Sequence, residues 1–202
     1  MTTISRRGLV RGGIAAAAGL GTVGILRRPA NAAEFTYKFG NNLPVDHPMN
    51  KRVQEVLPKI LEESHGKLEV RVFPNNQLGG DTDMLSQLRS GALQMFTLSG
   101  VILSTISKPM SMSGVAFAFP DYDHVWQAMD GDVGNYLRSL AGKLNLHALD
   151  KIFDNGFREI TSSTRPINTP DDLKGFKIRV PVSPMWTSLF QQGCSVLAMS
   201  GS

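Results

Sequence analysis

The sequence predicts an α/β fold in which helices cover a mainly parallel sheet. Stretches in which apolar and polar residues alternate, as in half-buried strands, recur along the chain, and stretches with helical apolar spacing lie between them. Hydrophobic residues make up 42% of the 202 residues and charged residues 19%, which is typical of a globular chain and argues against a disordered one. Because helices alternate with strands, we expect neighbouring strands to run parallel.

The chain up to residue 99 is predicted to form three strands and two helices. In chain order these are a strand at 35–40, a helix that begins near Pro48 and is ended by Gly66, a strand at 68–72, a helix at 82–90 and a strand at 93–99. Asp46 can cap the first helix, and Gly91 ends the second. Pro58 lies inside the first helix and predicts a kink or a split there, because proline lacks the N–H that the helix needs.

Residues 101–199 are predicted to begin with irregular structure and to continue with further helices and strands. Residues 101–120 are apolar but broken by Ser, Gly and Pro, which predicts loops and short buried pieces. Thereafter the pattern predicts one or two helices at 121–142, strands at 144–153, 157–162 and 177–180, a helix at 184–192 and a strand at 194–199. Thr169 can cap a short helical turn that begins at Pro170, and Asp171 and Asp172 suit its positive end.

Three loops that follow predicted strands are the expected places for ligand contacts. They comprise residues 41–47, 75–80 and 181–184. In parallel sheets covered by helices, ligands bind beyond the carboxyl ends of the strands.

Residues 1–32 are predicted to be a secretion signal of the twin-arginine type. Arg6 and Arg7 precede a 13-residue apolar run from Ile14 to Leu26, which is shorter than the roughly 20 residues that span a bilayer. Ala30-Asn31-Ala32 has the small-residue pattern of a cleavage site, so we expect cleavage near Ala32 and a periplasmic protein. The alternative is a lone helix that anchors the chain in the membrane.

The charge of the chain excludes a general attraction to nucleic acid once this signal is removed. The formal charge is +4, but five of the 21 basic residues and none of the 17 acidic residues lie in 1–32. Residues 33–202 therefore carry 16 basic and 17 acidic side chains, a net charge of −1. The dinucleotide-type pattern G-x-G-x-x-G at 19–24 follows four alanines inside the signal rather than a strand, so we discard it.

Signatures of catalysis and of metal or cofactor binding are absent from the sequence. There is no G-x-S-x-G nucleophile elbow, no G-x-x-x-x-G-K-[ST] phosphate loop and no H-E-x-x-H metal motif. Cys194 lies in an apolar stretch, which favours a buried thiol over a nucleophile with a basic partner. The sequence therefore predicts no enzyme, no metal and no cofactor.

Two arginines are candidate ligand contacts. Arg179 lies between Ile178 and Val180 on a predicted strand, so the alternation directs it away from the core face near the strand's carboxyl end. Arg158 also lies among apolar positions. A guanidinium can hold a carboxylate through two parallel hydrogen bonds, but a solvated arginine or a structural ion pair fits the same pattern.

A block of residues near the end of the chain resembles the signature of one family. The segments are Phe157-Arg158-Glu159-Ile160-Thr161, Arg165-Pro166-Ile167 and residues 169–181, which read TPDDLKGFKIRVP. They resemble the extracytoplasmic solute-binding proteins of tripartite ATP-independent periplasmic (TRAP) transporters, of the dicarboxylate-binding DctP type. Weaker matches agree at residues 39–42, 77–81, 84–91 and 119–121.

This resemblance implies a periplasmic binding protein-like fold in which two α/β lobes close on an organic acid. It implies that Arg179 pairs with the ligand carboxylate, that Arg158 adds a second contact, and that Asn42 contributes from the opposite lobe. The implied partners are a small organic acid and the TRAP membrane subunits, with the receptor acting as a monomer. The lobes are expected at 33–154 and 155–202.

The chain is shorter than members of that family usually are. We therefore expect the second lobe to be incomplete and the chain to be a truncated product. The main alternatives are a binding protein of another importer or a sensor, and a fragment that has lost binding. A periplasmic enzyme is a further class, which the absence of a nucleophile and base set disfavours.

Overall fold

The computed structural model describes residues 33–199. The predicted secretion signal at 1–32, with its cleavage site near Ala32, lies outside the described residues. None of the helices within 33–199 is both long and apolar enough to cross a membrane.

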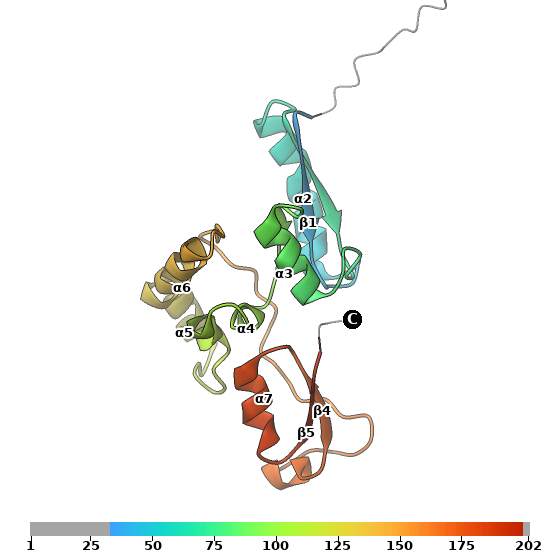
Figure 1. Ribbon diagram of the computed structural model, residues 1–202, viewed down its shortest axis with the longest axis vertical. Helices are drawn as coiled ribbons and strands as arrows, with labels where there is room; N and C mark the ends of the chain where they lie inside the picture. The colour runs from blue at the N-terminus through green and yellow to red at the C-terminus, as the bar shows by residue number, and fades with distance from the viewer. Residues whose placement is uncertain (1–32, 200–202) are drawn as a thin grey trace, which may run out of the picture. The chain divides into compact units, whose positions relative to one another are not determined.

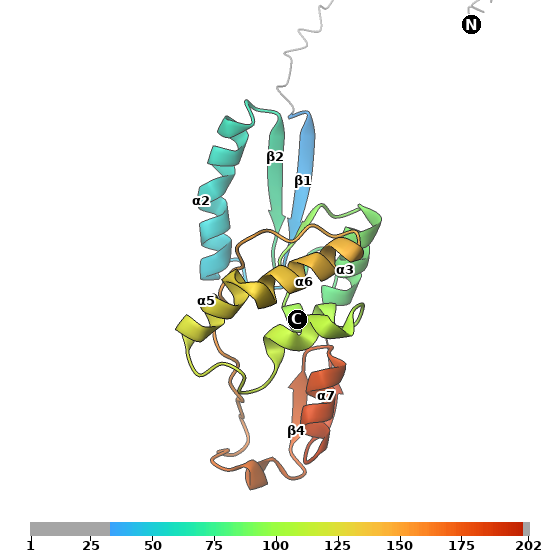
Figure 2. The same cartoon turned by 90° about the vertical axis from the view of Figure 1, so that its left-hand side faces the viewer.

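The first sheet has three parallel strands in the order β2-β1-β3. Strand β1 (Phe35–Gly40) lies in the middle, between β2 (Leu68–Phe73) and the short β3 (Met95–Phe96). Helix α2 (Pro48–Glu63) connects β1 to β2 and lies alongside them, and α3 (Asp81–Ser90) connects β2 to β3 (Figure 1, Figure 2). The parallel strand and helix alternation predicted for this part of the chain is confirmed.

The core of this part lies where α3 meets the end of β1. Met84 of α3 is fully buried, and Leu93 is 1% exposed. A Cβ atom added to Gly40 would lie 2.9 Å from the sulfur of Met84, so glycine lets helix and strand approach closely. This packing fixes the start of α3 near the carboxyl end of β1.

Helix α2 has a different cap from the predicted one and is not split at Pro58. His47 rather than Asp46 caps it, and His47 Nδ1 accepts a hydrogen bond from the N–H of Met49 (3.2 Å). Pro58 does not split the helix, which is continuous from Pro48 to Glu63. Pro58 is exposed, so water can satisfy the carbonyl group that loses its donor there.

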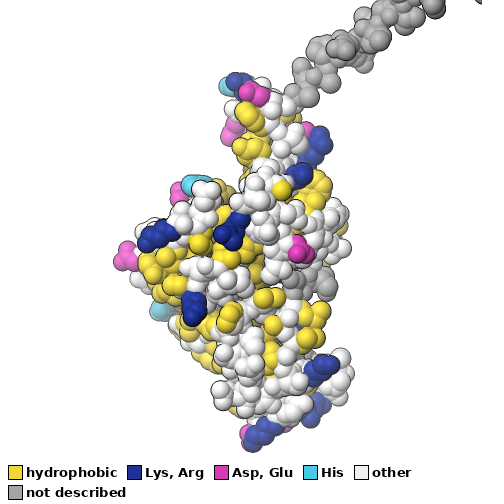
Figure 3. Space-filling model, viewed as in Figure 1, with side chains coloured by type: hydrophobic (Ala, Val, Ile, Leu, Met, Phe, Trp, Pro, Cys, Tyr) yellow, Lys and Arg dark blue, Asp and Glu magenta, His cyan; other side chains and the backbone are white. Residues whose placement is uncertain are grey.

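The middle of the chain forms short helices and a helical hairpin. The short buried pieces predicted within 101–120 are helix α4 (Gly100–Leu103), which buries Val101 and Ile102, and the 3₁₀ helix η1 (Lys108–Gly114), which buries Met110. The predicted helical region at 121–142 forms two helices, α5 (Tyr122–Asp130) and α6 (Asp132–Lys143). A buried cluster joins this hairpin to η1 through Met110, Met129, Leu137 and Ala141. Other hydrophobic side chains of the hairpin are exposed at the surface (Figure 3).

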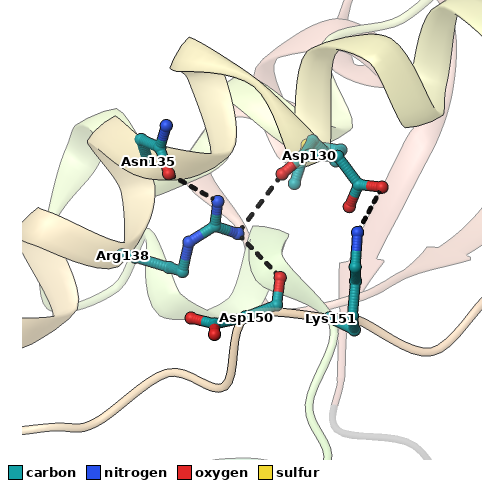
Figure 4. A network of polar contacts seen from close by, with 6 residues as sticks. Asp130, Asn135, Arg138, Asp150 and Lys151 are labelled. Atoms are coloured by element: carbon teal, nitrogen blue, oxygen red, sulfur yellow. Dashed lines mark hydrogen bonds and ion pairs between the residues drawn. The ribbon is translucent and has the colours of Figure 1, made fainter.

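A polar network attaches the next segment to the α5–α6 hairpin (Figure 4). Arg138 Nη1 donates to the carbonyl oxygens of Met129 (3.2 Å) and Asp150 (3.1 Å). Lys151 Nζ pairs with Asp130 Oδ2 at 2.6 Å. These contacts hold the segment that follows the hairpin, although the exposed Lys151–Asp130 ion pair contributes little by itself.

Two predicted strands, at 144–153 and 157–162, are wrong. The structure has no strand in either range, and the strand predicted at 93–99 is limited to Met95–Phe96. A strand needs a neighbour for its N–H and C=O groups, and no strand within 33–199 pairs with 144–162. Apolar side chains of this segment are exposed as a result, with Leu149 61% exposed.

The second sheet contains two parallel strands. Strand β4 (Lys177–Val180) pairs with β5 (Ser195–Ala198), and α7 (Pro184–Gln191) connects them (Figure 1). The 3₁₀ helix η2 (Pro170–Leu173) precedes β4 and has the predicted cap, Thr169. The strand, helix and strand predicted for this region are confirmed, whereas a lobe boundary near residue 154 stays a prediction.

Asp172 is expected to stabilise the turn at η2 through its negative charge. Its Oδ2 accepts hydrogen bonds from the N–H groups of Asn168 (2.9 Å) and Thr169 (2.8 Å) and from the Thr169 hydroxyl (3.0 Å). These bonds lower the pKa of Asp172 below its usual 3.8. The stabilisation is therefore fully present above pH 3.8 and is lost as the pH falls through the lowered pKa.

Asp172→Ala should lower the urea midpoint at pH 7, and the difference from the parent should shrink in acid below the usual carboxyl range. The matched control is Asp171→Ala, in the same turn, which loses an exposed ion pair with Lys174 but none of the hydrogen bonds that Asp172 accepts. Equal effects of the two substitutions, or a difference that does not change with pH, would contradict the role of Asp172.

Candidate functional site

The candidate site begins where the strands of the first sheet end. Asn42 follows β1, and Ser99 follows the neighbouring strand β3, so both lie at the same edge of the parallel sheet. The loop after β2 reaches the same edge, because the N–H of Asn76 donates to the carbonyl of Asn41 (3.2 Å). The predicted ligand loops at 41–47 and 75–80 therefore lie together.

A buried pair of asparagines fixes the loop that carries Asn42. Asn41 is 1% and Asn50 is 2% exposed, and Asn41 Nδ2 donates to Asn50 Oδ1 (2.8 Å). Asn41 Oδ1 accepts from the N–H of Leu43, and Asn50 Nδ2 donates to the carbonyl of Pro44 (2.7 Å). Since the loop backbone is bonded on both sides of Asn42, the position of that residue is set before any ligand arrives.

Asp81 is a site residue that the sequence analysis missed. It lies at the first position of α3, is 1% exposed, and its Oδ1 accepts a hydrogen bond from Asn42 Nδ2 (2.9 Å). Gly79, with φ +112°, makes the turn before the helix. The Gly79-Gly80-Asp81 sequence between a strand and a helix is the signal that could have drawn attention to it, because it places an acid at a helix N-terminus beside the strand ends.

Arg158 reaches this edge of the sheet from the extended segment after the α5–α6 hairpin. Its Nη2 donates to Ser99 Oγ (3.0 Å), and its guanidinium lies 5.0 Å from the centre of the Trp186 ring. Burial of the guanidinium, followed by the positive charge of Arg179, lowers the pKa of Arg158, while Asp81 opposes this shift. Both Arg179 and Asp81 are therefore within electrostatic reach of Arg158.

Trp186 supports Arg158 from α7. Its indole Nε1 donates to the carbonyl of Gly114 (2.9 Å), which lies at the end of η1. The edge of the indole is thus held by η1, while its face lies against the guanidinium of Arg158. The sequence analysis did not single out Trp186, because nothing in the local pattern indicates a contact 72 residues away.

Arg179 lies on β4 as the alternation predicted, exposed between half-buried Ile178 and buried Val180. Its Nη2 donates to the carbonyl of Met199 (2.7 Å), which leaves other guanidinium N–H groups available. Within 33–199 neither Arg158 nor Arg179 forms an ion pair with an acid at contact distance. Two nearby guanidinium groups without a close counter-ion favour the binding of an anion.

The third predicted ligand loop, 181–184, lines a hollow of about 480 Å³ at the end of β4. Thr105, which follows α4, borders it together with Ser183, the N-cap of α7, and Thr187 of α7. In the part of the chain that the structure describes, no three His, Cys, Asp or Glu side chains converge as a metal site would require. The thiol of Cys194 is half-buried and donates to the carbonyl of Leu173 (3.5 Å).

Comparison with protein families and known proteins identifies chains that are similar to this one. The family described as "Bacterial extracellular solute-binding protein, family 7" (DctP) matches residues 39–202. A 2,3-diketo-L-gulonate-binding periplasmic protein of Escherichia coli is 33% identical over 175 residues, which cover 86% of this chain and 52% of that protein. The chain thus spans about half the length of this curated relative.

Solved structures of similar proteins contain organic acids. A TRAP periplasmic solute-binding protein from Xanthobacter autotrophicus with bound β-D-galacturonate superposes with a TM-score of 0.76 at 32% identity, covering 81% of this chain and 55% of that one. One from Sulfurospirillum deleyianum with bound succinate also gives 0.76, at 31% identity, covering 82% and 54%. The fold predicted from the sequence, α/β and periplasmic binding protein-like, is confirmed for the part that these chains share.

Proposed function

Because the chain belongs to family 7 of the bacterial extracellular solute-binding proteins, we propose that it binds a small organic acid as the receptor of a TRAP-type importer. The observation that carries this proposal is the pair Arg158 and Arg179, whose charges are close enough to affect each other while neither has an acid at contact distance within 33–199. An anionic ligand would relieve that repulsion.

Each candidate residue has a distinct role in this proposal. Arg179, near the carboxyl end of β4, would hold the ligand carboxylate through two N–H groups. Arg158, supported by Trp186 and Ser99, would add a second charged contact. Asn42 would contact the ligand from the edge of the first sheet. The name of the Escherichia coli relative and the ligands in the Xanthobacter and Sulfurospirillum structures support an acid as ligand.

In this proposal the protein binds and releases its ligand without changing it chemically. It acts as a monomer in the periplasm. Cleavage near Ala32 would first remove the signal at residues 1–32. The mature protein would then pass the acid to the membrane subunits of the transporter. The receptor character of the family supports binding without reaction, and the periplasmic location of the relatives supports a periplasmic protein. The net charge of −1 for residues 33–202 gives no reason to expect nucleic acid as a partner.

Arg179→Gln is expected to weaken carboxylate binding about 30- to 150-fold, because a charge-assisted pair contributes about 2–3 kcal/mol. The measurement is isothermal titration of the purified chain with galacturonate and with succinate. Arg179→Lys should fall between the parent and Arg179→Gln, since it retains the charge but loses the planar fork.

The matched control is Arg52→Gln, which removes an exposed arginine on α2 that pairs only with Glu55 among the described residues. This variant should bind like the parent. Parent-like affinity in Arg179→Gln, or the same loss in both variants, would refute the proposed binding role.

A further inference from the structure

The first half of strand β1 has an open edge. The N–H of Phe35 donates to the carbonyl of the residue before β2, so the backbone groups of odd-numbered residues in β1 point toward β2. Those of even-numbered residues point the other way, where the N–H of Lys38 donates to Gln94 Oε1 (3.0 Å). Strand β3 begins only opposite Phe39, so no strand within 33–199 faces Thr36 on that side (Figure 2).

The side chains along this edge are exposed. Phe35 is 51% and Tyr37 is 38% exposed, although both are large hydrophobic residues. They share one face of β1, whereas Glu34, Thr36 and Lys38 share the other. An exposed strand edge that carries apolar side chains is a template on which another strand can pair.

A second copy of this chain fits the edge in one antiparallel register. Twofold symmetry places the central residue opposite itself, so the backbone groups of that residue must point away from β2. The candidates at the open edge are Glu34, Thr36 and Lys38. A centre at Glu34 or at Lys38 places like charges directly opposite each other, which is destabilising. Only a centre at Thr36 avoids this repulsion.

The side chains that meet in this register are complementary. Phe35 lies opposite Tyr37 of the second copy, and Glu34 lies opposite Lys38 of the second copy, each twice by symmetry. Aromatic pairs and opposite charges on neighbouring strands both stabilise a sheet. Within 33–199 the only ion pair of Glu34 is a 4.0 Å contact with Lys67, and Lys38 has none, so both charges are available.

We propose that two copies of this chain pair edge to edge through antiparallel β1 strands centred at Thr36. The N–H of each Thr36 donates to the Thr36 carbonyl of the other copy. Residues 34–38 alone meet, so the interface is smaller than the ~1,200 Å² that specific, stable interfaces bury. The expected dissociation constant is therefore about 0.1–1 mM, and the monomer predominates at micromolar concentration.

This pairing leaves the candidate ligand site accessible. Asn42 follows the carboxyl end of β1, and about 20 Å of extended chain separate it from Thr36. The proposal is thus independent of the proposed function. Galacturonate affinity should be the same in variants that pair and in variants that do not.

Sedimentation velocity of the purified chain from about 10 μM to about 1 mM measures the pairing. The average mass of the parent should rise across this range from that of one chain toward that of two. A mass that remains that of one chain at the highest concentration overturns the inference.

Thr36→Pro tests the centre of the interface. The N–H that proline lacks points away from β2, so the sheet of the single chain loses no hydrogen bond, and proline is tolerated on edge strands. Pairing should weaken at least about tenfold, because both central hydrogen bonds are lost. Parent-like pairing in this variant would place the contact on another surface and overturn the inference.

A charge exchange tests the register without changing the backbone. Lys38→Glu places carboxylates opposite each other at both ends of the interface and should abolish pairing at about 1 mM. Adding Glu34→Lys restores opposite charges, so the double variant should pair like the parent. The matched control Lys51→Glu makes the same change of charge on the exposed side of α2 and should also pair like the parent. A double variant that stays monomeric, or equal effects of the substitutions at Lys38 and Lys51, would overturn the inference.

Discussion

Replacing Gly134 with alanine is expected to destabilise the α5–α6 hairpin by about 3 kcal/mol or more. Gly134 is the third residue of α6, and a Cβ atom there would lie 1.7 Å from the carbonyl oxygen of Met129 and 2.6 Å from its carbonyl carbon. These are backbone atoms at the end of α5, so no side chain can rotate to make room. The helices would have to separate, at a cost above the usual 1–3 kcal/mol for overpacking.

The same helix provides a control with the opposite expected sign. Gly142 lies one residue before the end of α6, and no atom lies within 4 Å of the position where its Cβ would be. Gly142→Ala should raise the free energy of unfolding by about 0.5–1 kcal/mol, because alanine restricts the unfolded chain and favours helix. Urea unfolding of both variants measures the difference. A Gly134→Ala variant as stable as the parent would show that the two helices are not packed as described.

Trp186→Ala is expected to have the second largest effect, lowering the stability of the chain by about 2–4 kcal/mol and also weakening ligand binding. The indole is half-buried, donates to the carbonyl of Gly114, and lies against the guanidinium of Arg158. Alanine removes all three contributions, which together approach the cost of deleting a core aromatic residue. Because Arg158 would then retain only Ser99 as a fixed partner among the described residues, it would be less well positioned for a carboxylate.

Trp186→Phe separates the two functions of the indole. It keeps an aromatic face for Arg158 but loses the hydrogen bond to Gly114, so stability should fall by about 1 kcal/mol while galacturonate affinity stays close to that of the parent. Urea unfolding and isothermal titration of both variants give the two readouts. Equal loss of affinity in the Phe and Ala variants would mean that the ring face does not position Arg158.

The paired strands were predictable from the sequence, and the unpaired segments show the limit of that method. Residues 68–72 and 177–180 alternate because each has one face on a core, and each has a neighbouring strand within the described residues. Residues 144–153 and 157–162 are similarly apolar, yet no strand within 33–199 pairs with them and they form no strand. Periodicity reports burial tendency along one segment and contains no information on whether a partner strand is present.

The charged part of the candidate site could be predicted, whereas its supporting residues could not. Arg158 and Arg179 lie in a motif with a recognisable spacing, and Asn42 follows a strand that is itself easy to predict. Asp81 and Trp186 belong to the site only through contacts that span 39 and 72 residues of sequence. Such contacts depend on how separate elements pack, and local propensity does not specify that packing.

The bond between Trp186 and Gly114 has a consequence for the order of folding. It closes a loop of 72 residues, and the bond from Arg158 to Ser99 closes one of 59. Long loops lose more conformational entropy on closure than short ones, and contacts of high sequence separation slow folding. The contact between Asn42 and Asp81 spans only 39 residues and can form as soon as the first sheet is synthesised. Arg158 and Trp186 are therefore expected to join the site last, after Asn42 and Asp81 have come together.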